Sequence, residues 1–199
     1  MTNRRLMKKS LPAQLAAIAL VSALPWCLRA SSKKEFKAKD GSRVVVLPIG
    51  KPSGHEDSEN RLEFYSPQNQ MLCALDYSSE DSEHGFGVVK AAWTPDNNYF
   101  VFSLTSSGGH QAWHAPTLFY NLRDNSIHSL DSYVDAKISK GAFTLKDPNV
   151  VLTEVWREEQ PSPIKFRLDS LRSRRSRNAL RCADGKTIKA EPYSLQPDA

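Results

Sequence analysis

The sequence predicts an all-β domain built from antiparallel sheets, and three observations support this fold class. About nine short runs are rich in β-branched and aromatic residues or alternate between apolar and polar side chains. Turn-forming clusters of Gly, Pro, Asn, Asp and Ser separate these runs roughly every ten residues. Helical periodicity is weak and is confined to residues 132–140 and 169–181. The predicted strands lie at 44–47, 62–65, 71–77, 88–93, 99–104, 118–122, 127–130, 150–156 and 164–168.

This pattern divides the chain into four segments. They are a predicted signal peptide at 1–30, a loose lead-in at 31–42, the β-rich domain at 43–168 and an arginine-rich tail at 169–199. The tail is expected to be loose or to contain a short helix. With 40% hydrophobic residues, a chain of this length can bury one core, so we expect a single domain.

The first thirty residues have the three parts of a secretory signal peptide. Arg4, Arg5, Lys8 and Lys9 precede an apolar stretch that is short and interrupted by polar residues and prolines. A membrane-spanning helix needs about 20 continuous apolar residues, so a cleaved signal fits better. Cleavage after Ala30 would leave the domain in the periplasm or outside the cell.

Cys27 offers an alternative, because lipoprotein signals end at a cysteine that receives lipid. The residue before such a cysteine is normally small, whereas here it is Trp26, so we favour cleavage over a lipid anchor. A cytosolic protein with a buried N-terminal helix is a further alternative, but it explains the cluster of positive charges less well.

The charge is balanced once residues 1–30 are removed. The whole chain has 27 Lys and Arg residues against 22 Asp and Glu residues. Residues 1–30 contain five of the basic residues and none of the acidic ones, which leaves 22 of each. A neutral domain gives no reason to expect a nucleic-acid partner.

Cys73 and Cys182 remain after Cys27 is removed, and an even number permits a disulfide in an oxidising compartment. The bridge would close a loop of about 110 residues, nominally worth about 4–5 kcal/mol. Two separate thiols are the alternative, because Cys73 lies in an apolar run where a buried thiol also fits.

Residues 93–103 form the most specific local pattern, Trp-Thr-Pro-Asp-Asn-Asn-Tyr-Phe-Val-Phe-Ser. The proline presets a turn dihedral, Asp96 can accept a hydrogen bond from the backbone ahead of it, and asparagines such as Asn97 tolerate positive φ. In the following strand, Phe100 and Phe102 share one face and are expected to point inward, although the opposite face is also apolar.

This string resembles the blade motif of TolB-type β-propellers, in which a Trp-Ser-Pro-Asp-Gly turn leads into an aromatic strand that ends in Ser. Thr94 stands in place of Ser and Asn97 in place of Gly, and both changes are compatible with the same turn. The resemblance implies that residues 88–130 form one four-stranded blade, with 43–77 and 142–168 as degenerate neighbours. A closed propeller needs at least about four blades. We therefore expect propeller-blade-like sheets in an open stack, or a β-sandwich, acting as a binding scaffold.

A second unusual segment, residues 105–116, joins two predicted strands and is longer than a hairpin requires. It contains His110 and His114, which could bind a metal ion together, and a Glu-His pair in the acidic loop 77–87 could add ligands. The alternative, which we favour, is that Trp113 plugs the edge of the core while the histidines cap loop carbonyls. The candidate ligand-binding residues are His110, Trp113, His114, Glu83 and His84.

The C-terminal segment is basic, because residues 165–189 carry nine basic and two acidic side chains. Arginine clusters bind phosphate and carboxylate in bidentate fashion, so an acidic lipid head group or an acidic protein face would fit. A solvated helix face that pairs with the chain's own acidic loops is the alternative that we favour. The arginines concerned are Arg172, Arg174, Arg175 and Arg177.

Together these patterns favour an exported, non-enzymatic binding or interaction protein, whose partner is another protein or an envelope component. Its contact surface would be the loops 105–116 and 77–87. A metal-dependent hydrolase centred on His110 and His114 is the main alternative, and an envelope-associated structural protein held by the arginine tail is another. No cofactor is expected, and no motif identifies a catalytic residue.

Overall fold

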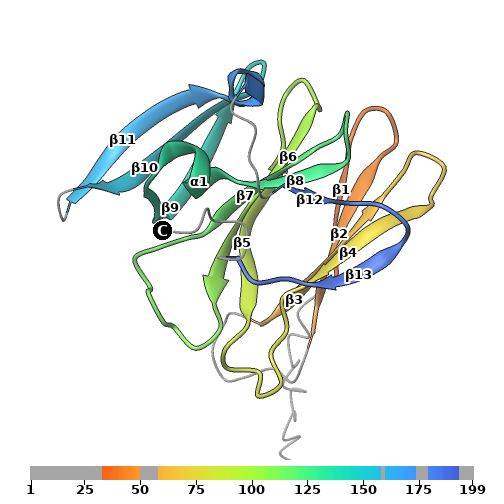
Figure 1. The fold of residues 1–199 in the computed structure, drawn as a ribbon, viewed down its shortest axis with the longest axis horizontal. Helices are drawn as coiled ribbons and strands as arrows, with labels where there is room; N and C mark the ends of the chain where they lie inside the picture. Colours follow the sequence, from red (N-terminus) through yellow and green to blue (C-terminus); the bar gives the residue numbers. More distant parts are fainter. Residues whose placement is uncertain (1–32, 50–57, 158–159, 174–178, 193–199) are drawn as a thin grey trace, which may run out of the picture.

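The computed structural model describes residues 33–49, 58–157, 160–173 and 179–192, and these residues have the predicted all-β fold (Figure 1). They form three sheets. The first sheet has the order β1 (Lys34–Lys37), β2 (Arg43–Pro48), β3 (Asn60–Tyr65), β4 (Met71–Asp76) and β13 (Lys186–Lys189). The middle sheet has the order β12 (Leu180–Arg181), β8 (Ser126–Ser129), β7 (Thr117–Asn121), β6 (Tyr99–Ser106) and β5 (Phe86–Trp93). The third sheet has the order β11 (Gln160–Arg167), β10 (Val150–Arg157) and β9 (Lys137–Lys146).

In each sheet, strands that follow one another in the chain form an antiparallel meander. The first and middle sheets each have one further short strand at the edge, which comes from the C-terminal part of the chain. Helical structure in the described ranges is limited to α1 (Leu130–Val134) and the 3-10 helix η1 (Leu168–Ser173). Neither helix has the length or the apolar composition needed to cross a membrane.

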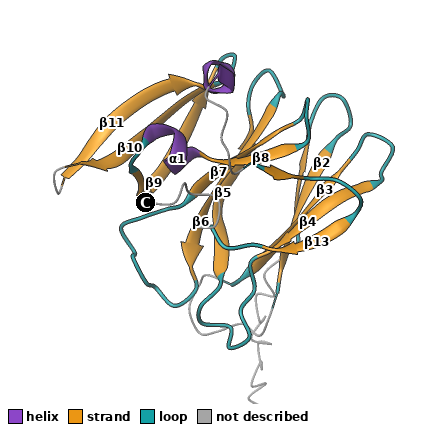
Figure 2. Cartoon of the chain, viewed as in Figure 1, coloured by secondary structure: helices purple, strands orange, loops and turns teal. Residues whose placement is uncertain are grey.

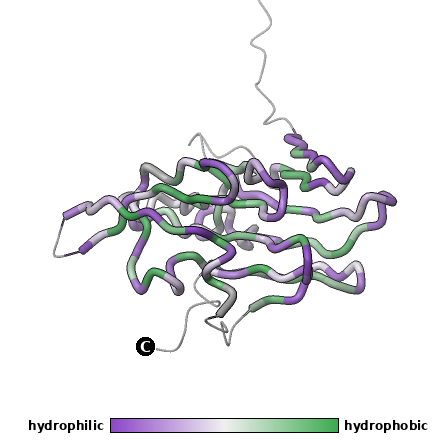
Figure 3. The backbone as a smooth tube through the Cα atoms, turned by 90° about the horizontal axis from the view of Figure 1, so that it is seen from above, coloured by the Kyte–Doolittle hydropathy of each residue, from purple (hydrophilic) through white to green (hydrophobic). Residues whose placement is uncertain are grey.

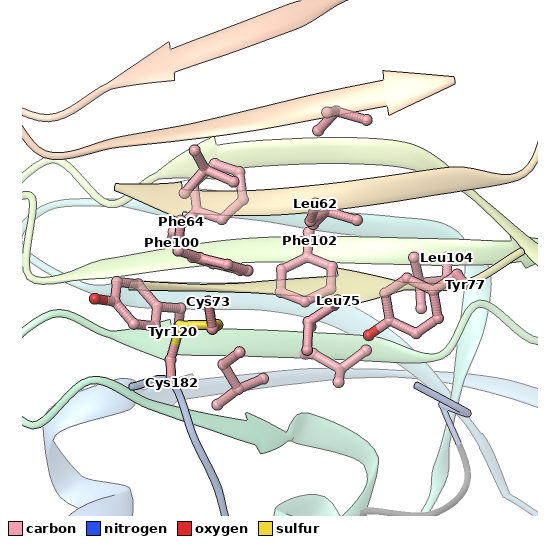
Figure 4. Close-up of a cluster of buried hydrophobic side chains, with 14 residues drawn as sticks. Leu62, Phe64, Cys73, Leu75, Tyr77, Phe100, Phe102, Leu104, Tyr120 and Cys182 are labelled. Carbon is pink, nitrogen blue, oxygen red and sulfur yellow. A yellow bond between two sulfur atoms is a disulfide. The ribbon is translucent and has the colours of Figure 1, made fainter. Parts of the chain in front are cut away.

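The middle sheet lies between the other two and is therefore buried on both faces (Figure 2). Phe100 and Phe102 point toward the first sheet, where they pack with Phe64 (Figure 4). Tyr99 and Val101 point the other way, into a second core formed with α1 and the third sheet. Hydrophobic residues run along the strands while hydrophilic residues gather at the turns (Figure 3). The apolar character of both strand faces thus reflects two cores.

The predicted turn before β6 is present. Asn97 has a φ of 58°, and its backbone N–H donates to the Thr94 carbonyl at 2.8 Å. Asp96 accepts hydrogen bonds from the Thr94 hydroxyl at 2.6 Å and from the Asn98 backbone at 3.1 Å. The four strands expected for the blade are present as β5 to β8, and the described sheets form no closed barrel or propeller. The TolB-type relationship itself stays a prediction.

Both ends of the described chain are more ordered than expected. The lead-in predicted to be loose contains β1, which pairs with β2 along its whole length. The tail contributes β12 to the middle sheet and β13 to the first sheet, where β13 pairs in parallel with β4. Between these two strands Cys182 forms the disulfide with Cys73, with 5.1 Å between the Cα atoms. Strands of two to four residues show little local periodicity, which is why sequence patterns missed β1, β12 and β13. The disulfide was one of the two alternatives that the sequence left open for the cysteines.

The weak helix predicted at 132–140 is mostly wrong. Helix α1 ends at Asp135, which adopts a φ of 50°, and the chain continues directly into β9. Ile138 is fully buried there because β9 packs its inner face against the middle sheet. Burial of this face overrides the modest helical propensity of the segment.

Candidate functional site

The segment 105–116, which we call the histidine loop, runs from the end of β6 to the start of β7. The acidic loop, residues 77–87, runs from β4 into β5. The first half of the histidine loop lies against the acidic loop, whereas its second half lies against β9 and α1. Each half is held by one buried carboxylate, and neither carboxylate was identified from the sequence.

Glu59 holds the first half. It lies immediately before β3 and is 2% exposed. Its carboxylate accepts hydrogen bonds from the Ser79 backbone at 2.6 Å and hydroxyl at 2.5 Å, from the Gly85 backbone at 2.7 Å and from the Ser107 hydroxyl at 2.9 Å. Burial raises the pKa of Glu59, but these four hydrogen bonds to the charged form outweigh it and lower the pKa below 4.5. Glu59 therefore ties both loops to the first sheet.

Two glycines allow this close packing. A Cβ atom at Gly85 would lie 2.3 Å from the carboxylate of Glu59, and one at Gly108 would lie 2.3 Å from the carbonyl oxygen of Glu83. Neither distance is sterically possible, so both positions require glycine. These glycines mark places where the chain packs closely around the two loops.

His84 and His110 meet on the outside of this junction. Their rings are stacked, with centroids 5.6 Å apart and planes at 15°. His84 Nδ1 also contacts Asp81, and both histidines are exposed. The structure thus brings together two of the predicted site residues, His84 and His110.

Asp131 holds the second half of the histidine loop. This aspartate lies in the first turn of α1 and is buried. Its carboxylate accepts hydrogen bonds from His114 Nε2 at 2.7 Å, from the Thr117 backbone at 2.9 Å and from the Ile138 backbone at 2.9 Å. His114 also forms an isolated bridge with Ser139 in β9. The imidazole is therefore part of the protein interior.

Trp113 lies next to this buried histidine but faces outward, with 41% of its surface exposed. Its ring meets that of Trp156 at 79°, with centroids 5.4 Å apart, and Lys137 Nζ lies 5.0 Å from the ring centroid. Its carbonyl accepts hydrogen bonds from Trp156 Nε1 and from the Lys140 backbone, both at 3.0 Å. We call the group of Trp113, Trp156 and Lys137 the tryptophan corner.

The structure therefore does not bring His110 and His114 together, as the alternative of a metal pair requires. The loop between them is not helical, because Gln111 has a φ of 54° and the chain turns back there. One imidazole consequently points to solvent and the other into the core. The favoured alternative is wrong in its details, since Trp113 does not plug the core and His114 bonds a carboxylate. Across the described ranges, no three or more His, Cys, Asp or Glu residues are grouped so that they could hold a metal ion.

Several predicted features lie outside the described residues. These are the signal peptide, Cys27 and the arginines at 174, 175 and 177. The predicted head-group contact through the arginine tail therefore stays a prediction.

No protein-family model, no curated protein and no solved structure matches the chain. The resemblance to a TolB-type blade thus rests on the motif around residues 93–103. The features that bear on function are therefore the side chains of the histidine loop and the acidic loop.

Proposed function

We propose that the protein is an exported, non-enzymatic binding protein that contacts a protein or another envelope component through the histidine loop, with Trp113 as the anchor. The observation that carries the proposal is an exposed tryptophan on a rigidly held loop. Tryptophan is among the residues most enriched in binding hot spots, because its ring buries a large apolar area with few rotatable bonds.

The surroundings of Trp113 support this role. The backbone that carries the ring is held by the two hydrogen bonds to the Trp113 carbonyl and, at the next residue, by the buried His114. A surface that is already ordered loses little conformational entropy on binding. Lys137 and Trp156 add a cation and a second aromatic ring to the same corner.

The disulfide supports the proposal that the protein is exported to an oxidising compartment. Disulfides persist in oxidising environments such as the periplasm and the cell exterior, and are rare in the cytosol. Cys73 and Cys182 are both fully buried in the first core, so their bridge belongs to the folded structure. This agrees with the signal peptide expected at residues 1–30.

The hydrolase alternative has less support. A catalytic zinc ion needs about three protein ligands and an open position. The side chain of His114 is engaged with Asp131 in the interior, which removes it from any centre built on His110.

Site-specific photocrosslinking in cells tests the contact surface. Val89 is the matched control, because it is an exposed apolar residue like Trp113, with 45% of its surface accessible, and lies on β5, outside the histidine loop and the tryptophan corner. A photoreactive amino acid at position 113 should give a discrete crosslinked product that is absent when the same amino acid stands at position 89. Equal crosslinking at both positions, or none at position 113, would remove the anchor from the proposal.

Mass spectrometry of the protein recovered from cells tests export. We expect an N-terminus near Ser31. A lipid mass on Cys27 would replace the free exported protein with a membrane-anchored one, and intact protein beginning at Met1 in the cytosol would overturn export.

A further inference from the structure

His84 and His110 come from loops far apart in the sequence, yet they form one exposed pair. The backbone beneath them is fixed, because the Ser107 backbone donates a hydrogen bond to the Gly85 carbonyl at 3.0 Å. Glu59 adds its own bonds to the same two loops. The two imidazoles are thus presented to solvent on a firm base, while the rings themselves can turn about their side-chain bonds.

Asp81 orients one of the two rings. Its carboxylate contacts His84 Nδ1 and also accepts hydrogen bonds from the Glu83 backbone and the Ser79 hydroxyl, both at 2.9 Å. A carboxylate in this position can accept a hydrogen bond from His84 Nδ1, which leaves Nε2 as the nitrogen available to a metal ion. A histidine whose second nitrogen donates to a carboxylate is the usual arrangement of a metal ligand.

We propose that His84 and His110 bind one divalent transition-metal ion through their imidazole nitrogens, with Asp81 orienting His84. Imidazole suits Cu²⁺, Ni²⁺ and Zn²⁺, and sites of this kind bind Cu²⁺ most tightly. Metal–nitrogen distances of about 2.0–2.1 Å require the two stacked rings to rotate toward a common point. Both rings are exposed, so this rotation takes place at the surface.

Water completes the coordination of this site, because no third His, Cys, Asp or Glu converges with the pair in the described part of the chain. Two protein ligands on an exposed surface hold an exchangeable ion, unlike the closed four-ligand sites of structural zinc. The pair is also distinct from the tryptophan corner, so this inference does not depend on the proposed binding function.

Copper titration of the protein purified from cells without a histidine tag tests the site. We expect one Cu²⁺ ion per chain in isothermal titration, and pulsed electron paramagnetic resonance should detect two coordinated imidazoles. Asp81→Asn should weaken binding by roughly 10–100-fold, the usual effect of losing an orienting carboxylate. His84→Ala and His110→Ala should each weaken it more than Asp81→Asn does.

His55→Ala and Gln111→Ala are the controls, the first removing another histidine and the second an exposed neighbour of His110. Both should leave Cu²⁺ affinity unchanged, and thermal denaturation should show that every variant is folded. Unchanged affinity in either His84→Ala or His110→Ala, a single coordinated imidazole, or loss of binding only in His55→Ala would each overturn the proposal.

Discussion

The two halves of the histidine loop use the same residue type for opposite purposes. His110 is exposed and stacks on a neighbouring histidine, whereas His114, four residues later, is enclosed and bonded to Asp131. Both halves are anchored by a buried carboxylate, Glu59 for the first and Asp131 for the second. The difference is that Glu59 is satisfied by backbone and hydroxyl donors, so it leaves the nearby histidines free to face outward.

The comparison shows that the hydrogen-bond partner of a histidine decides whether its ring is buried or exposed, more than its spacing from another histidine does. A buried carboxylate needs several donors, because leaving it unpaired in the interior is costly. Asp131 recruits an imidazole as one of its three donors.

Replacing Asp131 should have the largest effect on stability. Asp131→Ala leaves the Thr117 and Ile138 backbone N–H groups and the His114 imidazole without their shared acceptor. Removing one partner of such a buried group typically costs about 3–5 kcal/mol. Urea denaturation with the disulfide intact measures it. Asp81 contacts the exposed His84 as Asp131 contacts the buried His114, and Asp81→Ala should change stability by less than about 0.5 kcal/mol.

Glu59→Gln should lower stability by about 2–3 kcal/mol at neutral pH, because the charged acceptor of four hydrogen bonds is lost. The effect depends on pH. The folded pKa of Glu59 lies below 4.5, since its hydrogen bonds outweigh burial, so the unfolded chain binds the proton first as pH falls. The stabilisation is complete above the unfolded value of 4.5 and is lost as pH drops through the folded pKa.

Denaturation of both proteins between pH 3 and 7 checks this sign. The difference between wild type and Glu59→Gln should shrink at acidic pH. Other carboxylates titrate in the same range, so the difference between the two proteins is the informative quantity. A constant or growing difference toward low pH would contradict the assignment.

His114→Ala should cost about 2 kcal/mol, because Asp131 keeps its two backbone donors but loses a buried hydrogen-bond partner and the packing of the ring. His110→Ala should stay within about 0.5 kcal/mol of wild type, because its ring is exposed. The same urea series measures both. Equal losses in the two variants would mean that the loop halves do not differ as the structure indicates.

Trp113→Ala should cost only about 1 kcal/mol, from its aromatic contact with Trp156 and its cation–π contact with Lys137. A tryptophan in the core would instead cost about 3–5 kcal/mol. Chemical denaturation followed by circular dichroism is suitable, because the substitution alters tryptophan fluorescence. A loss as large as that of Asp131→Ala would contradict a surface role for this ring.

Local patterns were sufficient to predict β5 to β8 of the middle sheet. Short apolar runs between turn-forming clusters, the turn at residues 94–98 and the two cysteines left after Cys27 all have signals within a few residues or a simple count. The sequence by itself therefore determined the all-β class, the position of β5 to β8 and the availability of Cys73 and Cys182 for a disulfide.

Tertiary structure decided the site. Glu59 reaches Ser107 across 48 positions, and Asp131 reaches His114 across 17, so no short-range pattern could reveal either contact. The direction of each histidine depends on which carboxylate lies nearby after the sheets have packed. Because burial is a property of the assembled layers, spacing in the sequence could suggest that two imidazoles converge but could not place one in solvent and the other in the core.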